Sequence, residues 1–128
     1  MSQTIEILLV GAGGFFGAIS RYLIYLIERA YSSYQFPLGT LCINAVGCFL
    51  AGIMMAKIEQ SESVHRYLLL LSSMGFLGAF TTFSAFSVES LQLIRSHQPM
   101  WALLNMGANV LLGIGAVWLG RFVYSNLA

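Results

Sequence analysis

The longest stretches without a charged residue decide what this chain can fold into. No Asp, Glu, Lys or Arg occurs from Ala30 to Ala56, from Tyr67 to Val88, or from Ser96 to Gly120. Each stretch exceeds the roughly 20 residues that an α-helix needs to cross the hydrocarbon core of a bilayer. A fourth apolar segment runs from about Ile5 to Ile27, interrupted only by Glu6 and Arg21. The pattern predicts four membrane-spanning helices.

The composition fits this prediction, because the chain is 58% hydrophobic and 9% charged, whereas soluble domains average about 25% charged residues. We therefore expect one all-α integral membrane domain over residues 1–128, with the lipid bilayer as its surroundings. The expected spans are about 5–27, 37–57, 66–94 and 99–122. The net charge of +1 gives no indication of a nucleic-acid partner.

The cations divide evenly between the two sides of the membrane. With four spans, the N-terminus, the 57–66 link and the C-terminus lie on one side. That side holds Lys57, Arg66 and Arg121, and the other holds Arg29, Arg95 and, toward that end of the first span, Arg21. Three against three gives no preference under the positive-inside rule. The chain either inserts both ways up, which allows an antiparallel homodimer of dual topology, or takes one orientation set by something other than these charges.

Small residues mark the first two spans. Gly13 and Gly17 form a G-x-x-x-G pair, which predicts close approach of another helix. In the second span Thr40, Asn44 and Gly47 recur at helical spacing. Such a polar stripe either lines a cavity or bonds to a neighbouring helix. Cys42 and Cys48 lie six positions apart and therefore on different faces, which predicts buried, unlinked thiols.

The third span carries the features that predict an interrupted helix. Gly75, Gly78 and the adjacent Thr81 and Thr82 lie at its centre. Glycines weaken a helix, and threonine hydroxyls offer substitute partners for freed backbone groups. A break at mid-membrane is tolerated only where protein or water covers it.

Uncharged polar side chains are expected at mid-span depth in three spans: Thr40, Asn44, Thr81, Thr82, Ser84, Ser87, Asn105 and Asn109. Amide and hydroxyl hydrogens can solvate an anion, and their oxygens a cation. Phe83 and Phe86 share one face beside the serines. They are either ordinary core aromatics or rings that present their positive edges to an anion.

Apart from residues at the very ends of the spans, such as Glu6, the charged residues inside a span are Arg21 and Glu89, both within about two turns of the same membrane face. They either pair with each other or leave Glu89 in an aqueous vestibule. A small multidrug exporter, which also has four spans, would be expected to carry a glutamate deep in its first span, where this chain has glycines and phenylalanines. A non-transporting membrane assembly subunit would need only the glycine-rich faces.

Three ordered motifs resemble the Fluc (CrcB-type) fluoride channels over nearly the whole chain. They are Gly14-x-x-Gly17-Ala18-x-x-Arg21-Tyr22, Gly39-Thr40-Leu41-x-x-Asn44-x-x-Gly47-x-Phe49-x-x-Gly52, and Gly75-x-x-Gly78-x-x-Thr81-Thr82-Phe83-Ser84-x-Phe86-Ser87-x-Glu89. The resemblance implies a channel, not an enzyme, that passively exports fluoride across the bacterial inner membrane and relieves its toxicity. It also implies an antiparallel homodimer with two pores.

The resemblance further assigns site residues. A structural sodium ion at the dimer interface would be held by the main-chain carbonyls of Gly78 and Thr81. The fluoride pathway would use Asn44, Phe83 and Phe86, with Thr40, Thr82, Ser84 and Ser87 as nearby donors. Arg21 matches the family's arginine in the first span. Where some relatives offer tyrosine and serine hydroxyls in the fourth span, this chain has Asn105 and Asn109, whose amides can still donate.

Overall fold

The computed structural model describes residues 2–31, 36–60 and 66–127, and all regular structure in these ranges is helical. The elements are α1 (Gln3–Tyr31), α2 (Leu38–Gln60), α3 (Arg66–Leu69), η1 (Leu70–Leu77), α4 (Gly78–Phe80), α5 (Phe83–Arg95) and α6 (Pro99–Leu127). Four segments are long and apolar enough to cross a membrane: α1, α2, the run Arg66–Arg95 and α6. The prediction of a four-span, all-α membrane protein is therefore confirmed.

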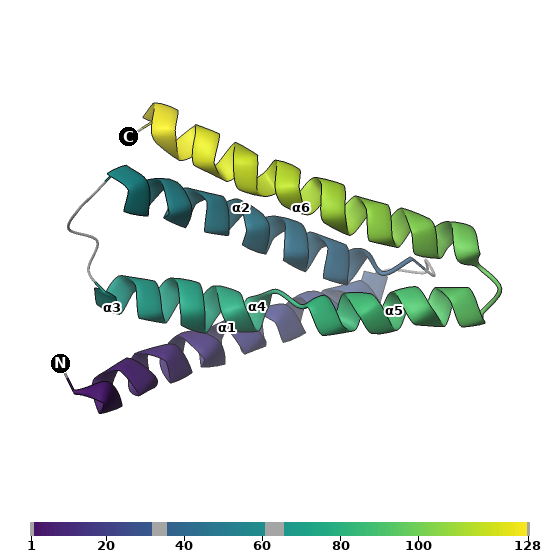
Figure 1. The fold of residues 1–128 in the computed structure, drawn as a ribbon. Helices are drawn as coiled ribbons and strands as arrows, with labels where there is room; N and C mark the ends of the chain where they lie inside the picture. Colours follow the sequence, from purple (N-terminus) through teal and green to yellow (C-terminus); the bar gives the residue numbers. More distant parts are fainter. Residues whose placement is uncertain (1, 32–35, 61–65, 128) are drawn as a thin grey trace.

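The spans form two packed pairs. α2 lies beside α6, and α1 crosses the third span at η1 and α4, with α5 resting on α6 (Figure 1). The two chain ends lie at the same end of the bundle, as an even number of spans requires (Figure 1). The N-terminal half of the third span thus packs on α1, while its C-terminal half packs on α6.

Glycines make both pairings possible. A methyl group at Gly13 would overlap the main-chain oxygen of Leu71, and one at Gly17 would overlap that of Phe76. The Cα of Gly75 lies 3.0 Å from where a Cβ on Gly13 would stand. The predicted role of the Gly13–Gly17 pair in close helix approach is therefore confirmed. Gly120 plays the same part between α6 and α2, where it faces the main-chain oxygen of Phe49.

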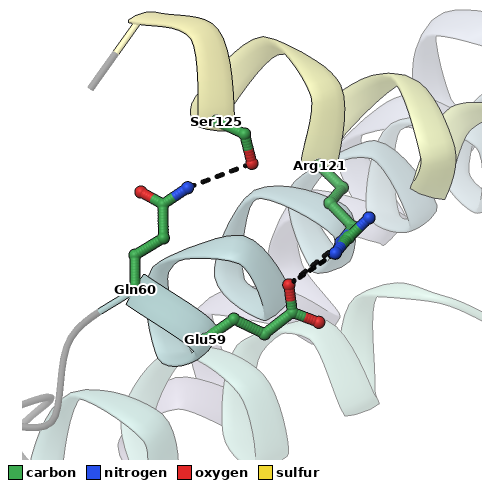
Figure 2. Close-up of polar contacts among 4 residues, drawn as sticks. All are labelled: Glu59, Gln60, Arg121 and Ser125. Atoms are coloured by element: carbon green, nitrogen blue, oxygen red, sulfur yellow. Dashed lines mark hydrogen bonds and ion pairs between the residues drawn. The ribbon is translucent and has the colours of Figure 1, made fainter.

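Ion pairs join the helices at the end of the bundle that carries the chain termini. Arg66 Nε lies 2.9 Å from Glu6 Oε1, which ties α3 to α1. At the same end, Arg121 Nη2 lies 2.9 Å from Glu59 Oε2, which ties α6 to α2 (Figure 2). Both pairs are partly exposed, so each adds at most about 1 kcal/mol to stability.

The third span departs from a regular helix twice. η1 is π-helical over Leu70–Leu77, a wide form that is rare and often found at functional sites. The sequence did not predict it. The helix is then interrupted: Thr81 has φ −75° and ψ 156°, and Thr82 has φ −150° and ψ 111°, so both are extended. α5 begins at Phe83, within the run where the sequence predicted an interruption.

The two cysteines are free, as predicted. Cys48 is half-buried, but Cys42 is exposed, so the prediction that both are buried is wrong. Cys42 borders a surface groove between the ends of α1 and α2, beside Ile24 and Leu38, that no other part of the described chain fills.

Candidate functional site

A groove of about 440 Å³ opens where α2, α6 and the interruption of the third span meet. It brings together five of the side chains that the sequence predicted for an ion pathway: Asn44, Thr82, Phe83, Phe86 and Asn109. Gly78 and Thr81, the predicted carbonyl ligands, also line it. Residues from three spans converge here although they are far apart in the sequence.

Asn44 lines this groove, and its side-chain amide bonds to the interruption. Its Oδ1 accepts a hydrogen bond from the Thr82 N–H at 2.9 Å. Its Nδ2 donates to Asn109 Oδ1 at 2.9 Å and to the Thr82 carbonyl at 3.3 Å. The Asn44 amide therefore serves both backbone groups of Thr82, which a continuous helix would have satisfied internally.

The interruption frees main-chain carbonyls on its N-terminal side. In a continuous α-helix the Thr82 N–H would donate to Gly78 and the Ala85 N–H to Thr81. Instead the Thr82 N–H donates to Asn44, and the Ala85 N–H donates to Thr82 Oγ1 at 3.1 Å. The carbonyls of Gly78 and Thr81 thus lose their regular helical donors. Free carbonyl oxygens are the ligands that hard cations take, so these two residues fit the predicted sodium site.

The C-terminal side of the interruption has the opposite polarity. Thr82 caps α5 through its hydroxyl, and the first amides of a helix carry partial positive charge. The rings of Phe83 and Phe86 flank this end, with their centroids 5.4 Å apart and their planes at 53°. Phe83 is 80% exposed. An anion in the groove would therefore meet helix N–H groups, aromatic rings and amide side chains, the donors that anions need.

Four predicted pathway residues lie outside the groove lining: Ser84, Ser87, Thr40 and Asn105. Ser84 is exposed and its hydroxyl lies 3.2 Å from that of Thr82. Ser87 is exposed and donates to the Phe83 carbonyl at 2.8 Å. Thr40 is fully buried and donates to Glu89 Oε1 at 2.6 Å. Since that uses its only hydroxyl hydrogen, the 3.1 Å contact with Tyr25 Oη must be donated by the tyrosine.

Asn105 is also outside the groove and is fully buried. It accepts from Asn109 Nδ2 at 2.9 Å and donates through Nδ2 to Ser90 Oγ at 3.0 Å. Sequence reasoning missed Ser90, although the three-residue spacing of Ser84, Ser87 and Ser90 was a signal for it. Ser73, another missed residue, lines the groove.

Arg21 and Glu89 form no ion pair within the described chain, whose ion pairs are Arg66–Glu6 and Arg121–Glu59. The first of the two predicted alternatives is therefore wrong for a single chain. The reason is topological: α1 packs on η1 and α4, whereas Glu89 lies on α5. Glu89 instead borders a second pocket of about 330 Å³, and its Oε2 is buried without a hydrogen-bond partner. The vestibule alternative stays a prediction.

Comparison with known proteins identifies the family. A family model described as "CrcB-like protein, Camphor Resistance (CrcB)" matches residues 8–121. The chain belongs to the CrcB family. This membership confirms the resemblance drawn from the three sequence motifs. The match spans α1 through most of α6, so it includes all the residues of the groove.

Curated relatives align with this chain over nearly their whole length. A protein of Dehalococcoides mccartyi named "Fluoride-specific ion channel FluC" is 43% identical over 122 residues, which is 95% of this chain and 94% of that protein. One of Campylobacter lari with the same name is 43% identical over 118 residues, 92% of this chain and 96% of its own. "Fluoride-specific ion channel FluC 1" of Methanosarcina acetivorans is 43% identical over 123 residues.

Proposed function

We propose that this CrcB-family chain is a fluoride channel that lets the ion leave the cell down its electrochemical gradient. The relatives named as fluoride-specific channels support the choice of ion. The observation that carries the proposal within this chain is the groove, because Asn44, Asn109 and the capped start of α5 gather neutral donors there.

Neutral donors suit fluoride for a physical reason. An ion moved into a low-dielectric medium without partners costs tens of kcal/mol, so a conducting path must replace its hydration shell. Fixed N–H and aromatic C–H groups fit a small, strongly hydrogen-bonding anion better than a large one. Asn44, Phe83 and Phe86 are the central contacts in this proposal. Thr82 and Asn109 extend the path inside the groove, and Ser84 and Ser87 extend it along the exposed face of α5.

We further propose that two copies pair as an antiparallel homodimer of dual topology with two pores. The exposed Phe83 and the exposed Gly78 beside the freed carbonyls support an interface at the interruption. Gly78 and Thr81 of both copies would hold a structural sodium ion there, whose charge stabilises the converging carbonyl dipoles. The interruption divides the run Arg66–Arg95 near its middle, which supports a position at mid-membrane. We place the dimer in the bacterial inner membrane.

Fluoride efflux from liposomes loaded with potassium fluoride tests the proposal. An electrode records the released ion after a potassium ionophore has removed the charge imbalance. Wild-type protein should release fluoride only with the ionophore present, because a channel moves net charge. Proton-driven drug movement in place of fluoride efflux would indicate a small multidrug exporter. No flux of either kind would indicate an assembly subunit.

Two variants test the pore residues in the same assay. Asn44→Asp places a carboxylate in the path, and two like charges 4 Å apart repel by about 4 kcal/mol at an effective dielectric constant near 20. We expect fluoride flux to fall by about 1,000-fold, since 1.4 kcal/mol corresponds to a factor of ten. Phe83→Ile keeps an apolar side chain but removes the ring edge. Unaltered flux in both variants would refute the pore assignment.

A further inference from the structure

A line of hydrogen bonds leaves the groove and runs into the buried contact between α5 and α6. Asn44 Nδ2 donates to Asn109 Oδ1 at 2.9 Å, and Asn109 Nδ2 donates to Asn105 Oδ1 at 2.9 Å. Asn105 Nδ2 donates to Ser90 Oγ at 3.0 Å, and Ser90 donates to the Phe86 carbonyl at 2.8 Å. We call these four side chains the relay: Asn44, Asn109, Asn105 and Ser90. Along the relay each side chain donates to the next, from Asn44 to Ser90.

Backbone groups fix the direction of the relay at both ends. The Thr82 N–H can only donate, so it requires the oxygen of the Asn44 amide. The Phe86 carbonyl can only accept, so it requires the hydrogen of Ser90. In the middle, Asn109 Nδ2 also donates to the main-chain oxygen of Asn105 at 3.0 Å. A flip of any one asparagine amide in the relay would exchange its Oδ1 and Nδ2. It would then place oxygen against oxygen or N–H against N–H.

The two hydrogen bonds that Asn44 Nδ2 donates differ in how readily an anion could replace them. Asn44 Nδ2 makes a short bond to Asn109 and a longer one, 3.3 Å, to the Thr82 carbonyl. The longer bond is outside the usual N–H···O range and is the weaker of the two. The hydrogen that Asn44 can turn toward an anion in the groove is therefore the one now directed at Thr82. The relay keeps the other hydrogen occupied and the amide oriented.

We propose that Ser90 and Asn105 are positioning residues of the fluoride path, which act through Asn109 and Asn44 and do not contact the ion. Neither lines the groove, and both are buried: Asn105 is 0% and Ser90 is 6% exposed. Asn105, which the sequence predicted as a pathway residue, therefore positions Asn109 and Asn44 and does not itself contact the ion. The proposal rests on the proposed channel function, but its central claim concerns the orientation of the Asn44 amide and can be measured without any ion flux.

The experiment compares three serine variants of the full-length protein in liposomes. Ser90→Ala removes both the acceptor for Asn105 and the donor to Phe86, whereas Ser90→Thr keeps the hydroxyl. Ser72→Ala is the matched control, because Ser72 also donates to the carbonyl four residues before it, that of Leu68, and lies in the same span outside the relay and the groove. We expect Ser90→Ala to lower fluoride flux roughly tenfold, the effect of one buried unsatisfied amide. Ser90→Thr and Ser72→Ala should stay near wild type.

Solid-state NMR of protein labelled with ¹⁵N at asparagine side chains gives the second measurement. Ser90→Ala should shift the Asn44 side-chain amide signal although two residues of the relay separate them, and Ser72→Ala should not. The proposal is wrong if Ser90→Ala conducts like wild type, or if its flux falls while the Asn44 signal stays in place. If the wild-type protein carries no fluoride, the proposed channel function is wrong. The positioning of Asn44 by Ser90 is then tested by the NMR shift alone.

Discussion

Replacement of Gly47 by alanine tests how α2 supports the interruption of the third span. A Cβ on Gly47 would overlap the Cγ2 methyl of Thr81 and lie 3.4 Å from Cδ1 of Phe80. Thr81 cannot rotate away freely, because its hydroxyl donates to the Leu77 carbonyl at 2.9 Å. The new methyl group therefore either forces the helices apart or breaks that hydrogen bond.

The size of the effect follows from these two outcomes. Inserting a methyl group into a packed contact costs about 1–3 kcal/mol, and the hydrogen bond of Thr81 is worth about 1 kcal/mol. We therefore expect Gly47→Ala to lower the free energy of unfolding by about 1–2 kcal/mol. Thr81→Ser deletes the overlapping methyl and keeps the hydroxyl, so it should cost less than about 1 kcal/mol alone.

The double variant Gly47→Ala/Thr81→Ser makes the test specific. Its stability should match that of Thr81→Ser, because alanine then fills the space that the methyl group left. Reversible unfolding in detergent micelles measures all four proteins of this cycle. Gly107→Ala is the control, since a Cβ on Gly107 meets nothing within 4 Å. Additive losses in the double variant, or a Gly47→Ala protein as stable as wild type, would refute the reasoning.

Three further outcomes are expected, one each from a packing contact, a helix cap and an ion pair. Gly13→Ala should disrupt the contact of α1 with η1 and reduce folded protein on size-exclusion chromatography, whereas Gly11→Ala, which meets nothing within 4 Å, should not. Thr82→Val should cost about 1 kcal/mol of stability through loss of the cap on α5, and Thr82→Ser should restore most of it; equal losses in both would contradict a capping role. Glu59→Gln should change the free energy of unfolding by less than about 1 kcal/mol, since its ion pair with Arg121 is partly exposed. A larger loss in unfolding experiments would contradict this small contribution of the ion pair.

Much of the fold followed from local sequence features. Uncharged stretches predicted the four spans because burying a charge in lipid is costly whatever the helix packs against. The Gly13–Gly17 pair predicted close packing because only glycine admits a neighbouring backbone. The interruption at Thr81 and Thr82 was predicted for a similar local reason, since glycines and hydroxyl residues weaken a helix where they stand. The π-helix of η1 gave no comparable signal in the sequence.

The sequence by itself determined the number of spans, the place of the interruption and the polar residues available for an ion path. Tertiary structure alone decided which of those residues meet. It set Asn44 against Thr82 and Asn109, and it separated Arg21 from Glu89 by packing α1 away from α5. It also buried Asn105 against Ser90, a residue that no motif singled out. The physical reason is that a hydrogen bond depends on distances and angles between helices, and these are set by packing across the bundle.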